Sequence, residues 1–502
     1  MMKQIPLFKV YMSNDLSIVN DTLRSGFITQ GNQVELLEQK LKEYFKYPYI
    51  LTLNSATSGL TLAYRLLDLN PETDYVLSTP LTCFATNSSI LTNNLNIIWC
   101  DTDPNTCNID LDDVKRKITK NTKALTFVHW GGNPVNLNKV NEIKKYAKER
   151  YCIDLHVIED CAHAFGAEFE NKKLGTHNNI CVFSLQAIKH FTCGDGGLIF
   201  LPNKKLYDRA KLLRWFGIDR NRRSLPGQDF RLEPDIPEYG YKFHMNDINA
   251  SIGLINFPNI DNILKTCRDN GKYYNDNLQN IFGIKLFENI MNGSYWIYTI
   301  KILYNYKNSF MEFMKNKGIV TSQVHARNDN HSCVKEYKTT LPNLDIIETE
   351  IVSIPVGWWV TAEQREYIVN CIKEFSISLP LKLLKLEEKD IKEYEELISI
   401  KNNNYDKFDN IYVLKYENKI ISSCKLLVEK KLNNNLGHIE DVFTHTDFRK
   451  KGFGRYLVMD IIDKALYEFN CYKVTLSCKN ELENFYKKCG MNLSGLSFEK
   501  RK

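Results

Sequence analysis

Lys189 is the residue whose setting most clearly suggests chemistry. It lies in 182–200, VFSLQAIKHFTCGDGGLIF, between an apolar run and a cluster of glycines at Gly194, Gly196 and Gly197. Apolar runs on either side of a glycine-rich segment predict a strand, a turn that carries Lys189, and a second strand. An amine held on such a turn can form a Schiff base with a carbonyl compound. A surface lysine on a β-turn has the same local pattern, so residues elsewhere must decide.

A second group of polar residues follows another apolar run. Segment 157–167, VIEDCAHAFGA, places Asp160 at the end of a predicted buried strand and His163 three residues later. A buried carboxylate is costly unless it is paired. The protonated pyridine nitrogen of pyridoxal phosphate (PLP) would supply that partner, and His163 could reach the ring or its 3′-oxygen. Alternatively, Asp160 closes a strand as a helix cap.

A turn of small residues could bind the phosphate of such a cofactor. The short predicted strand Tyr49–Leu53 is followed by 54–59, NSATSG, and then by the helical run LTLAYRLL. Backbone N–H groups and the helix dipole attract an anion at such a helix start, and Thr57 and Ser58 add hydroxyl donors. A plain helix N-cap has the same composition.

The elements around these motifs predict an α/β fold. Short apolar segments alternate with helical segments such as Leu111–Ile118 and Val140–Tyr151, which indicates a mostly parallel sheet with helices on both faces. The predicted strands are Tyr75–Pro80, Ile97–Asp101, Ala124–His129, His156–Glu159 and Cys181–Ser184. Ligands gather at the carboxyl ends of such strands, where the motifs above fall.

Composition is that of a large globular protein. With 502 residues, 43% hydrophobic and 25% charged, the chain should hold two or three domains. A net charge of +6 is small for this length and does not indicate nucleic acid as a partner. The 14 cysteines form no CxxC pair, so we expect reduced thiols, no metal site and a cytoplasmic location. No apolar run reaches the ~18 residues that span a membrane.

Three of these segments resemble the signature blocks of the DegT/DnrJ/StrS-type sugar aminotransferases, which are fold-type I PLP enzymes. They are 54–59, 157–167 and 182–198. The blocks PLFKVYMS, SGFITQG, FVHWGGNPVNL, GYKFHMNDINASIG and IVSIPVGWWVTAEQREYIV extend the resemblance in the same order over about residues 5–375. It implies a PLP-binding large domain at 1–255, a small domain of helices and antiparallel strands at 256–375, and a homodimer.

The resemblance implies a role for each matched residue. Lys189 would be the Schiff-base lysine and would also carry the proton between the amino acid and the cofactor. Asp160 would pair with the pyridinium, and His163 would support the ring hydroxyl. The phosphate cradle would consist of Thr57, Ser58 and Ser184. Within the family, a histidine at the lysine position marks a dehydratase branch, so Lys189 favours transamination.

Two blocks depart from the family pattern. The residue that stacks on the PLP ring is usually aromatic, and here the block reads TCFAT at 82–86, which leaves Cys83 or Phe84 for that place. The block GYNYR, which reaches into the neighbouring subunit's site, reads GYKFH here, and its Lys242 could still reach a phosphate. The late family histidines match His325 and His331, and we expect His325 to contact substrate.

A second set of predicted strands and helices begins at about residue 381, after the short linker SISLP at 376–380. The predicted elements are strands Asn410–Lys415 and Ile420–Val428 around a turn at 417–419, strand His438–Phe443, helix Tyr456–Glu468, strand Val474–Cys478 and helix Glu483–Lys488. The segment RKKGFGR, at 449–455, opens the first of these helices. Basic residues and glycines at a helix start bind pyrophosphate, although a plain basic loop looks the same.

This order of elements resembles the GNAT acetyltransferases, and over about 410–502 it is similar to the glucosamine-6-phosphate N-acetyltransferases. The resemblance implies acetyl-CoA as co-substrate and a proton donor, Tyr486, for the leaving CoA thiolate; a core aromatic on a helix face has the same pattern. The residues implied in binding are Arg449, Gly452, Gly454 and Arg455 for acetyl-CoA, and Glu440 and Asp441 for the acceptor. Segment 432–436 is shorter than in those enzymes and Leu482 replaces an expected Asn, so we expect a different acceptor.

Together the resemblances predict a fused pathway. The first domain would transfer an amino group, by family habit from glutamate, to a nucleotide-linked keto-deoxy sugar such as a UDP- or dTDP-4-keto-6-deoxyhexose. The domain at 381–502 would then acetylate that amine. Three alternatives stay open: a non-catalytic C-terminal module that stabilises a dimer or docks a partner, a PLP-dependent sugar dehydratase, and a non-catalytic regulator of the same fold.

Overall fold

The structure is a computed structural model that describes residues 4–220, 235–288, 292–398, 410–431 and 434–494. The chain divides into two compact units, which are described separately below. Unit 1 comprises Met1–Gln279, Leu286–Lys301 and Met311–Asn370, and unit 2 comprises Asn280–Lys285, Ile302–Phe310 and Cys371–Lys502.

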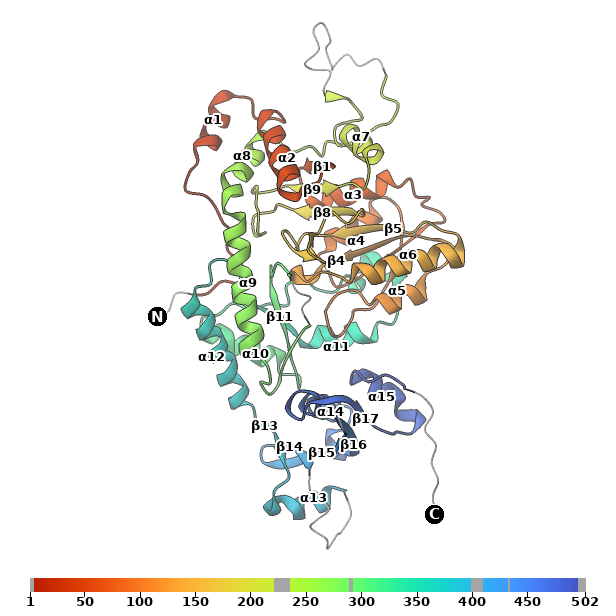
Figure 1. Ribbon diagram of the computed structural model, residues 1–502, viewed down its shortest axis with the longest axis vertical. Helices are drawn as coiled ribbons and strands as arrows, with labels where there is room; N and C mark the ends of the chain where they lie inside the picture. The colour runs from red at the N-terminus through yellow and green to blue at the C-terminus, as the bar shows by residue number, and fades with distance from the viewer. Residues whose placement is uncertain (1–3, 221–234, 289–291, 399–409, 432–433, 495–502) are drawn as a thin grey trace. The chain divides into compact units, whose positions relative to one another are not determined.

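A seven-stranded sheet forms the centre of unit 1, in the order β1-β9-β8-β5-β4-β2-β3 (Figure 1). The strands are β1 (Ile50–Leu53), β2 (Tyr75–Ser78), β3 (Asn96–Trp99), β4 (Thr122–Val128), β5 (His156–Asp160), β8 (Ile180–Ser184) and β9 (Gly197–Phe200). Strand β9 runs antiparallel to β1 and β8, and the other pairs are parallel. The mostly parallel sheet predicted from the sequence is therefore confirmed.

Both faces of this sheet are buried, because neighbouring strand residues enter two different hydrophobic cores. Leu77 and Val157 belong to one core, and Val76 and Ile158 belong to the other. The first core is completed by α2 (Asn32–Phe45), α5 (Leu111–Lys117), α6 (Leu137–Tyr151) and α8 (Asp247–Asn256). The second is completed by α3 (Ala56–Leu66), α4 (Phe84–Leu91), α7 (Lys204–Leu213) and α11 (Pro342–Glu350). This two-sided burial explains the continuous apolar runs of the strands.

Short polar side chains determine where several helices begin. Ser55 accepts a hydrogen bond from the backbone N–H of Ser58 at the start of α3, and Asn203 accepts one from Leu206 at the start of α7. Asp110 and Asn136 cap α5 and α6 in the same way. Each cap satisfies a donor that the helix itself leaves free.

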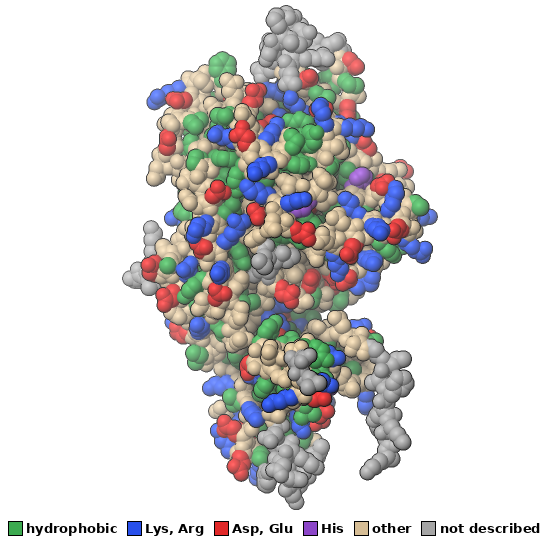
Figure 2. All heavy atoms as spheres, viewed as in Figure 1, with side chains coloured by type: hydrophobic (Ala, Val, Ile, Leu, Met, Phe, Trp, Pro, Cys, Tyr) green, Lys and Arg blue, Asp and Glu red, His purple; other side chains and the backbone are tan. Residues whose placement is uncertain are grey.

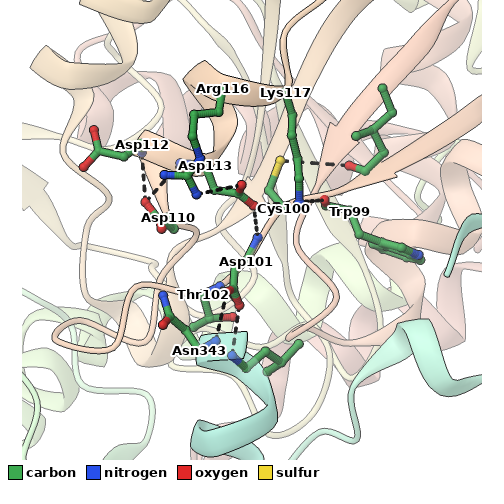
Figure 3. A network of polar contacts seen from close by, with 12 residues as sticks. Trp99, Cys100, Asp101, Thr102, Asp110, Asp112, Asp113, Arg116, Lys117 and Asn343 are labelled. Atoms are coloured by element: carbon green, nitrogen blue, oxygen red, sulfur yellow. Dashed lines mark hydrogen bonds and ion pairs between the residues drawn. The ribbon is translucent and has the colours of Figure 1, made fainter. Parts of the chain in front are cut away.

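A polar network joins the end of β3 to the start of α11 (Figure 3). The carboxylate of Asp101 accepts hydrogen bonds from the backbone N–H groups of Asn343 and Leu344, each at 2.9 Å. The backbone N–H of Asp101 donates to Asp113 at 2.7 Å, and Lys117 pairs with that same carboxylate at 2.8 Å. The network thus attaches α11, from late in the chain, to an edge strand of the central sheet.

The remaining helices and strands up to residue 378 lie outside the central sheet. They are α1 (Ser17–Ser25), β6 (Glu168–Phe169), β7 (Lys172–Lys173), α9 (Ile260–Asn277), β10 (Ile284–Leu286), β11 (Tyr298–Ile302), α10 (Lys307–Asn316), β12 (Ile351–Ile354) and α12 (Ala362–Ser378). Strands β11 and β12 pair antiparallel, with Tyr298 opposite Ile354.

Unit 2 contains a five-stranded sheet in the order β13-β14-β15-β16-β17. Its strands are β13 (Leu381–Lys385), β14 (Ile411–Tyr416), β15 (Lys419–Lys430), β16 (Asn435–Thr444) and β17 (Cys471–Thr475), and its helices are α13 (Ile391–Ile398), α14 (Phe453–Asp463) and α15 (Glu483–Lys488). The first four strands are antiparallel, whereas β17 runs parallel to β16. Glu417 and Asn418 have positive φ, as the predicted hairpin turn requires.

Two predicted boundaries in this region are wrong. Strand β17 ends at Thr475 and not at Cys478, because its ladder with β16 stops at the pair His438–Thr475. The apolar alternation continues beyond that point without a partner strand. Helix α14 ends at Asp463, and 464–468 form a π-helical turn instead of further α-helix.

Charged side chains of both signs are interspersed on the face of the molecule seen in Figure 2. The small net positive charge is therefore not gathered into one patch on that face. Among the described helices, none is both long and apolar enough to cross a bilayer.

Candidate functional sites

The residues predicted to hold PLP lie at one edge of the unit 1 sheet. Asp160 is the last residue of β5 and Ser184 the last of β8. Val182 lies opposite Asp160 in the ladder, and Gly197 lies opposite both Ser184 and Leu53. The parallel strands therefore bring together segments that are far apart in the sequence.

Lys189 lies on the turn between β8 and β9, as predicted, and its backbone N–H donates to Gln186. Burial lowers the pKa of its amine from 10.5 to about 7, although the nearby Asp160 and Cys83 act in the opposite direction. A substantial fraction of the amine is then uncharged at neutral pH. An uncharged amine can act as a nucleophile and as a base.

Asp160 is held by two hydrogen bonds, although its side chain is only 3% exposed. The hydroxyl of Thr86 donates to Oδ2 at 2.6 Å, and the backbone N–H of Ala162 donates to Oδ1 at 3.0 Å. Burial raises the pKa of Asp160, and these hydrogen bonds oppose the rise. A cation such as a protonated pyridine nitrogen would stabilise the carboxylate further, so the site fits PLP.

His163 and His325 face each other beside Lys189, with their Nε2 atoms 3.4 Å apart. Burial and the charge of Lys189 lower the pKa of both imidazoles, to about 4 for His325 and well below the usual value for His163. The backbone N–H of Gly131 donates to His163 Nδ1. His163 therefore carries its proton on Nε2 and donates it to His325.

The start of α3 offers a cradle for a phosphate group. Ser58 Oγ lies 2.9 Å from Ser55 Oγ, and Thr57 is exposed at the helix start. A Cβ on Gly197 would lie 2.4 Å from the carbonyl carbon of Ser55, so only glycine allows β9 to pass this close. The side-chain amide of Asn54 donates to the carbonyl of Lys242, which places the Lys242 segment beside the cradle.

The two candidates for the ring-stacking position differ in their surroundings. Cys83 is exposed at the start of α4 and is close enough to Lys189 to affect the pKa of its amine. The ring of Phe84 instead packs edge-on against His331, with centroids 5.1 Å apart. This geometry favours Cys83 for the position that faces the cofactor.

A buried pair below the site was not predicted. His129 Nε2 donates to Glu159 at 2.9 Å, because the backbone N–H of Val135 already donates to its Nδ1. Burial would raise the pKa of Glu159, but the hydrogen bonds from His129 and Asn179 outweigh it and hold the pKa below its usual value. His129, Glu159 and Cys161 also have the proximity of metal ligands. Since both imidazole nitrogens are already hydrogen-bonded, the pair instead joins β4 to β5.

The start of α14 in unit 2 has the geometry of an anion site. Gly452 has a φ of 88°, and a Cβ on Gly454 would lie 2.7 Å from Thr444 Oγ1, so the helix start approaches the end of β16 closely. The guanidinium of Arg449 donates to the carbonyl of Thr444 at 2.9 Å. Arg455 lies over the ring of Tyr456 at 4.6 Å. Backbone N–H groups at this helix start fit a pyrophosphate.

Strands β16 and β17 pair only up to His438, whereas β16 continues to Thr444. Glu440 and Asp441 are exposed on the part of β16 that β17 does not cover and that pairs only with β15, and Asp441 has a φ of 50°. The predicted loop 432–436 lies partly outside the described residues, at 432–433.

Tyr486 lies on α15 and is partly buried. Burial, with smaller effects from nearby thiols such as Cys478, raises the pKa of its phenol to about 12. The hydroxyl therefore stays protonated at neutral pH and can donate a proton. Leu482, where an Asn was expected, is exposed and directly precedes this helix.

Comparison with known proteins agrees with this geometry. Residues 11–373 match the DegT/DnrJ/EryC1/StrS aminotransferase family. The chain belongs to this family. Residues 378–491 match the Acetyltransferase (GNAT) family, so a GNAT domain follows the aminotransferase domain.

Similar proteins are sugar aminotransferases. The crystal structure of sugar aminotransferase CalS13 from Micromonospora echinospora is 41% identical, with a TM-score of 0.70, over 74% of this chain and 99% of that protein. GDP-perosamine synthase of Escherichia coli O157:H7 is 30% identical over 60% of this chain and 78% of that protein. UDP-4-amino-4,6-dideoxy-N-acetyl-beta-L-altrosamine transaminase of Campylobacter jejuni is 29% identical over 62% of this chain and 80% of that protein.

The predicted family, fold class and cofactors are confirmed by these findings. The chain is an enzyme, a sugar aminotransferase of fold type I with a C-terminal GNAT domain. PLP is the cofactor of the first family, and acetyl-CoA is the co-substrate of the second.

Proposed function

We propose that this enzyme transfers an amino group from glutamate to C4 of a nucleotide-linked 4-keto-6-deoxyhexose, and that its GNAT domain then acetylates the new amine. The observation that carries the first step is the low-pKa amine of Lys189 beside the buried carboxylate of Asp160. The C4 position is supported by the 4-amino-4,6-dideoxy sugar in the name of the Campylobacter jejuni relative.

PLP, when bound, supplies an electron sink for bond changes at the α-carbon of the amino acid. Lys189 would hold the cofactor and, with its pKa of about 7, would accept and return the proton at that carbon. Asp160 would keep the pyridine nitrogen protonated, and His163 would donate its Nε2 proton to the ring oxygen in place of His325. The start of α3, with Thr57 and Ser58, would hold the phosphate together with Ser184 and Lys242.

In the GNAT domain, the start of α14 would hold the pyrophosphate of acetyl-CoA through its backbone N–H groups, Arg449 and Arg455. Tyr486 would protonate the departing CoA thiolate, since its phenol is protonated at neutral pH. Glu440 and Asp441 would contact the acceptor on the part of β16 that extends beyond its ladder with β17. The order of the two domains in one chain motivates the coupling of the two steps.

We also propose that the enzyme works as a homodimer. Large apolar side chains are exposed in unit 1, among them Phe27 at 83% and Tyr239 at 72%. Exposed apolar surface can mark a protein–protein interface, so these side chains are candidates for the dimer contact. Analytical ultracentrifugation of the full chain should give twice the monomer mass, and a monomer at micromolar concentration would contradict the proposal.

The full chain can be tested with UDP-, dTDP- and GDP-linked 4-keto-6-deoxyhexoses, glutamate and acetyl-CoA. Mass spectrometry and NMR should identify an N-acetylated 4-amino sugar nucleotide from one of them. Accumulation of the free amino sugar alone would refute acetylation and favour a non-catalytic C-terminal module. A deoxygenated product without nitrogen would indicate a dehydratase instead.

A further inference from the structure

We propose that Trp296 is a positioning residue of the PLP site, whose indole holds the amine of Lys189 and the ring of His163 in place and shields the amine from water. The inference deepens the proposed transamination and rests on Lys189 being its PLP lysine. Sequence reasoning did not single out Trp296, because it lies in the segment that leads into β11, far from the signature blocks.

Trp296 is held by two hydrogen bonds, one from its indole and one from its backbone. Its Nε1–H donates to the backbone carbonyl of Ile188 at 3.0 Å, and its backbone N–H donates to the carbonyl of Gly131 at 2.9 Å. The side chain is only 4% exposed. Because Ile188 directly precedes Lys189, Trp296 holds the turn that presents the amine.

The amine of Lys189 lies over this ring, with Nζ 3.4 Å from the ring centroid. Within the described part of the chain, no hydrogen bond or ion pair engages Nζ, so the contact with the indole is its main polar interaction there. The ring has two opposite effects on the amine. It excludes water, which favours the uncharged form, and its π-electrons attract the charged form.

The imidazole of His163 stacks on the same indole, with centroids 3.9 Å apart and an angle of 23° between the planes. Gly131, which accepts from the backbone of Trp296, also donates to His163 Nδ1. Trp296 therefore acts on His163 twice, through its ring and through the peptide that fixes the histidine tautomer. One side chain thus sets the relative placement of the proposed base and the proposed donor to the ring oxygen.

Trp130 offers a matched control. It is also buried, at 3% exposed, and its Nε1 donates to Thr299 Oγ1 at 3.0 Å. Its ring meets His163 and His325 edge-on at 6.0 and 5.9 Å. Replacing Trp130 removes an indole and one hydrogen bond near the same histidines, but not the ring under Lys189.

The direct test is to titrate the amine of Lys189 in the full-length, cofactor-free protein. Its protonation is measured from the extent of reductive methylation at each pH, by mass spectrometry of the Lys189 peptide. Wild type and Trp130→Phe should titrate near pH 7, and Trp296→Leu above about 8, because water reaches the amine and this outweighs the lost cation–π attraction. If the amine of Lys189 titrates at the same pH in Trp296→Leu as in Trp130→Phe, the shielding role is wrong.

Trp296→Phe keeps an aromatic face but loses the hydrogen bond to Ile188, and it tests positioning even if the leucine variant does not fold. In the glutamate half-reaction, followed by the visible absorbance of the PLP-loaded protein, its maximal rate should fall about tenfold with little change in the glutamate concentration needed for half-saturation. Trp130→Phe should stay within about twofold of wild type. Equal losses in the two variants would overturn the proposal. If glutamate leaves the wild-type spectrum unchanged, the proposed transamination is wrong. The titration of Lys189 in the cofactor-free protein would still test the shielding role of Trp296.

Discussion

Burial drives Lys189 and Asp160 toward their uncharged forms in the cofactor-free protein. It lowers the pKa of the amine and raises that of the carboxyl, although the two groups attract each other when charged. Such opposed shifts are typical of catalytic sites. A site of this kind favours a ligand that brings its own positive charge to Asp160 and a carbonyl to Lys189, which PLP does.

Thr86→Val should impair this balance at Asp160. The hydroxyl of Thr86 donates to the carboxylate at 2.6 Å and opposes the effect of burial on its pKa. Without it the pKa of Asp160 rises further, so the carboxylate that the pyridine nitrogen needs is lost at a higher pH. We expect the acidic limb of the pH–rate profile of the glutamate half-reaction to move to higher pH, with a rate loss of about tenfold or more at pH 6.

Thr82→Val is the control for that variant. Thr82 lies 2.8 Å from the Thr86 hydroxyl but does not contact Asp160. Its acidic limb should stay near that of wild type. A shift as large as that of Thr86→Val would show that packing, and not the hydrogen bond to Asp160, is responsible.

Two helix starts, one in each unit, carry the proposed anion sites. Helix α3 follows β1, an edge strand of the central sheet, and α14 follows a glycine-containing basic loop. Backbone N–H groups at either helix start would bind a phosphate without the need for a buried cation. The two proposed sites therefore depend on the same property of the helix.

Ser55→Ala should destabilise the protein and weaken PLP binding. The cap at α3 is lost, which costs about 1 kcal/mol, and the Ser58 hydroxyl loses its partner. Asn203→Ala, at the cap of α7, should cost a similar free energy of unfolding without changing PLP affinity. Thermal unfolding and PLP titration distinguish the two. Equal PLP affinity in both variants would argue against a phosphate at the α3 start.

Gly454→Ala should abolish or strongly weaken acetyl-CoA binding. Alanine is favourable within a helix, so the loss would come from the new Cβ, which meets Thr444 Oγ1 at 2.7 Å and displaces the helix start. Adding Thr444→Ala removes that oxygen and should restore most of the affinity measured by calorimetry. A double variant no better than Gly454→Ala would place the cause elsewhere.

At the scale of the whole molecule, the chain joins an aminotransferase domain to a GNAT domain that follows it. The amine produced by the first is the kind of group that the second acetylates. The proposed coupling therefore makes two single substitutions informative, because each should stop one step and leave the other.

Tyr486→Phe should leave amination unchanged and slow acetylation by about 10²-fold or more, so the free amino sugar nucleotide accumulates. Lys189→Ala should abolish amination and the visible PLP absorbance but retain acetyl-CoA binding. Chromatography with mass detection of both reactions provides the measurement. N-acetylated product at the wild-type rate from Tyr486→Phe would show that Tyr486 is not the proton donor.

The local sequence by itself determined the strand–turn–strand around Lys189, the alternation of strands and helices, and the order of the motifs at the strand ends. These features depend on residue spacing and on turn residues, which act over a few positions. The parallel sheet then implied that Asp160, Ser184 and the start of α3 share one edge. The helices and strands of the GNAT domain could also be predicted from local residue spacing, apart from the ends of α14 and β17.

Only the tertiary structure decided how distant side chains meet at that edge. The bond from Thr86 to Asp160, the pair of His163 and His325, and the indole of Trp296 under Lys189 join segments with no common pattern in the sequence. For the same reason, Cys83 acts on the pKa of the Lys189 amine, whereas the ring of Phe84 packs against His331. Packing sets these contacts, and so do the pKa values, because burial is a property of the folded chain and not of any single segment.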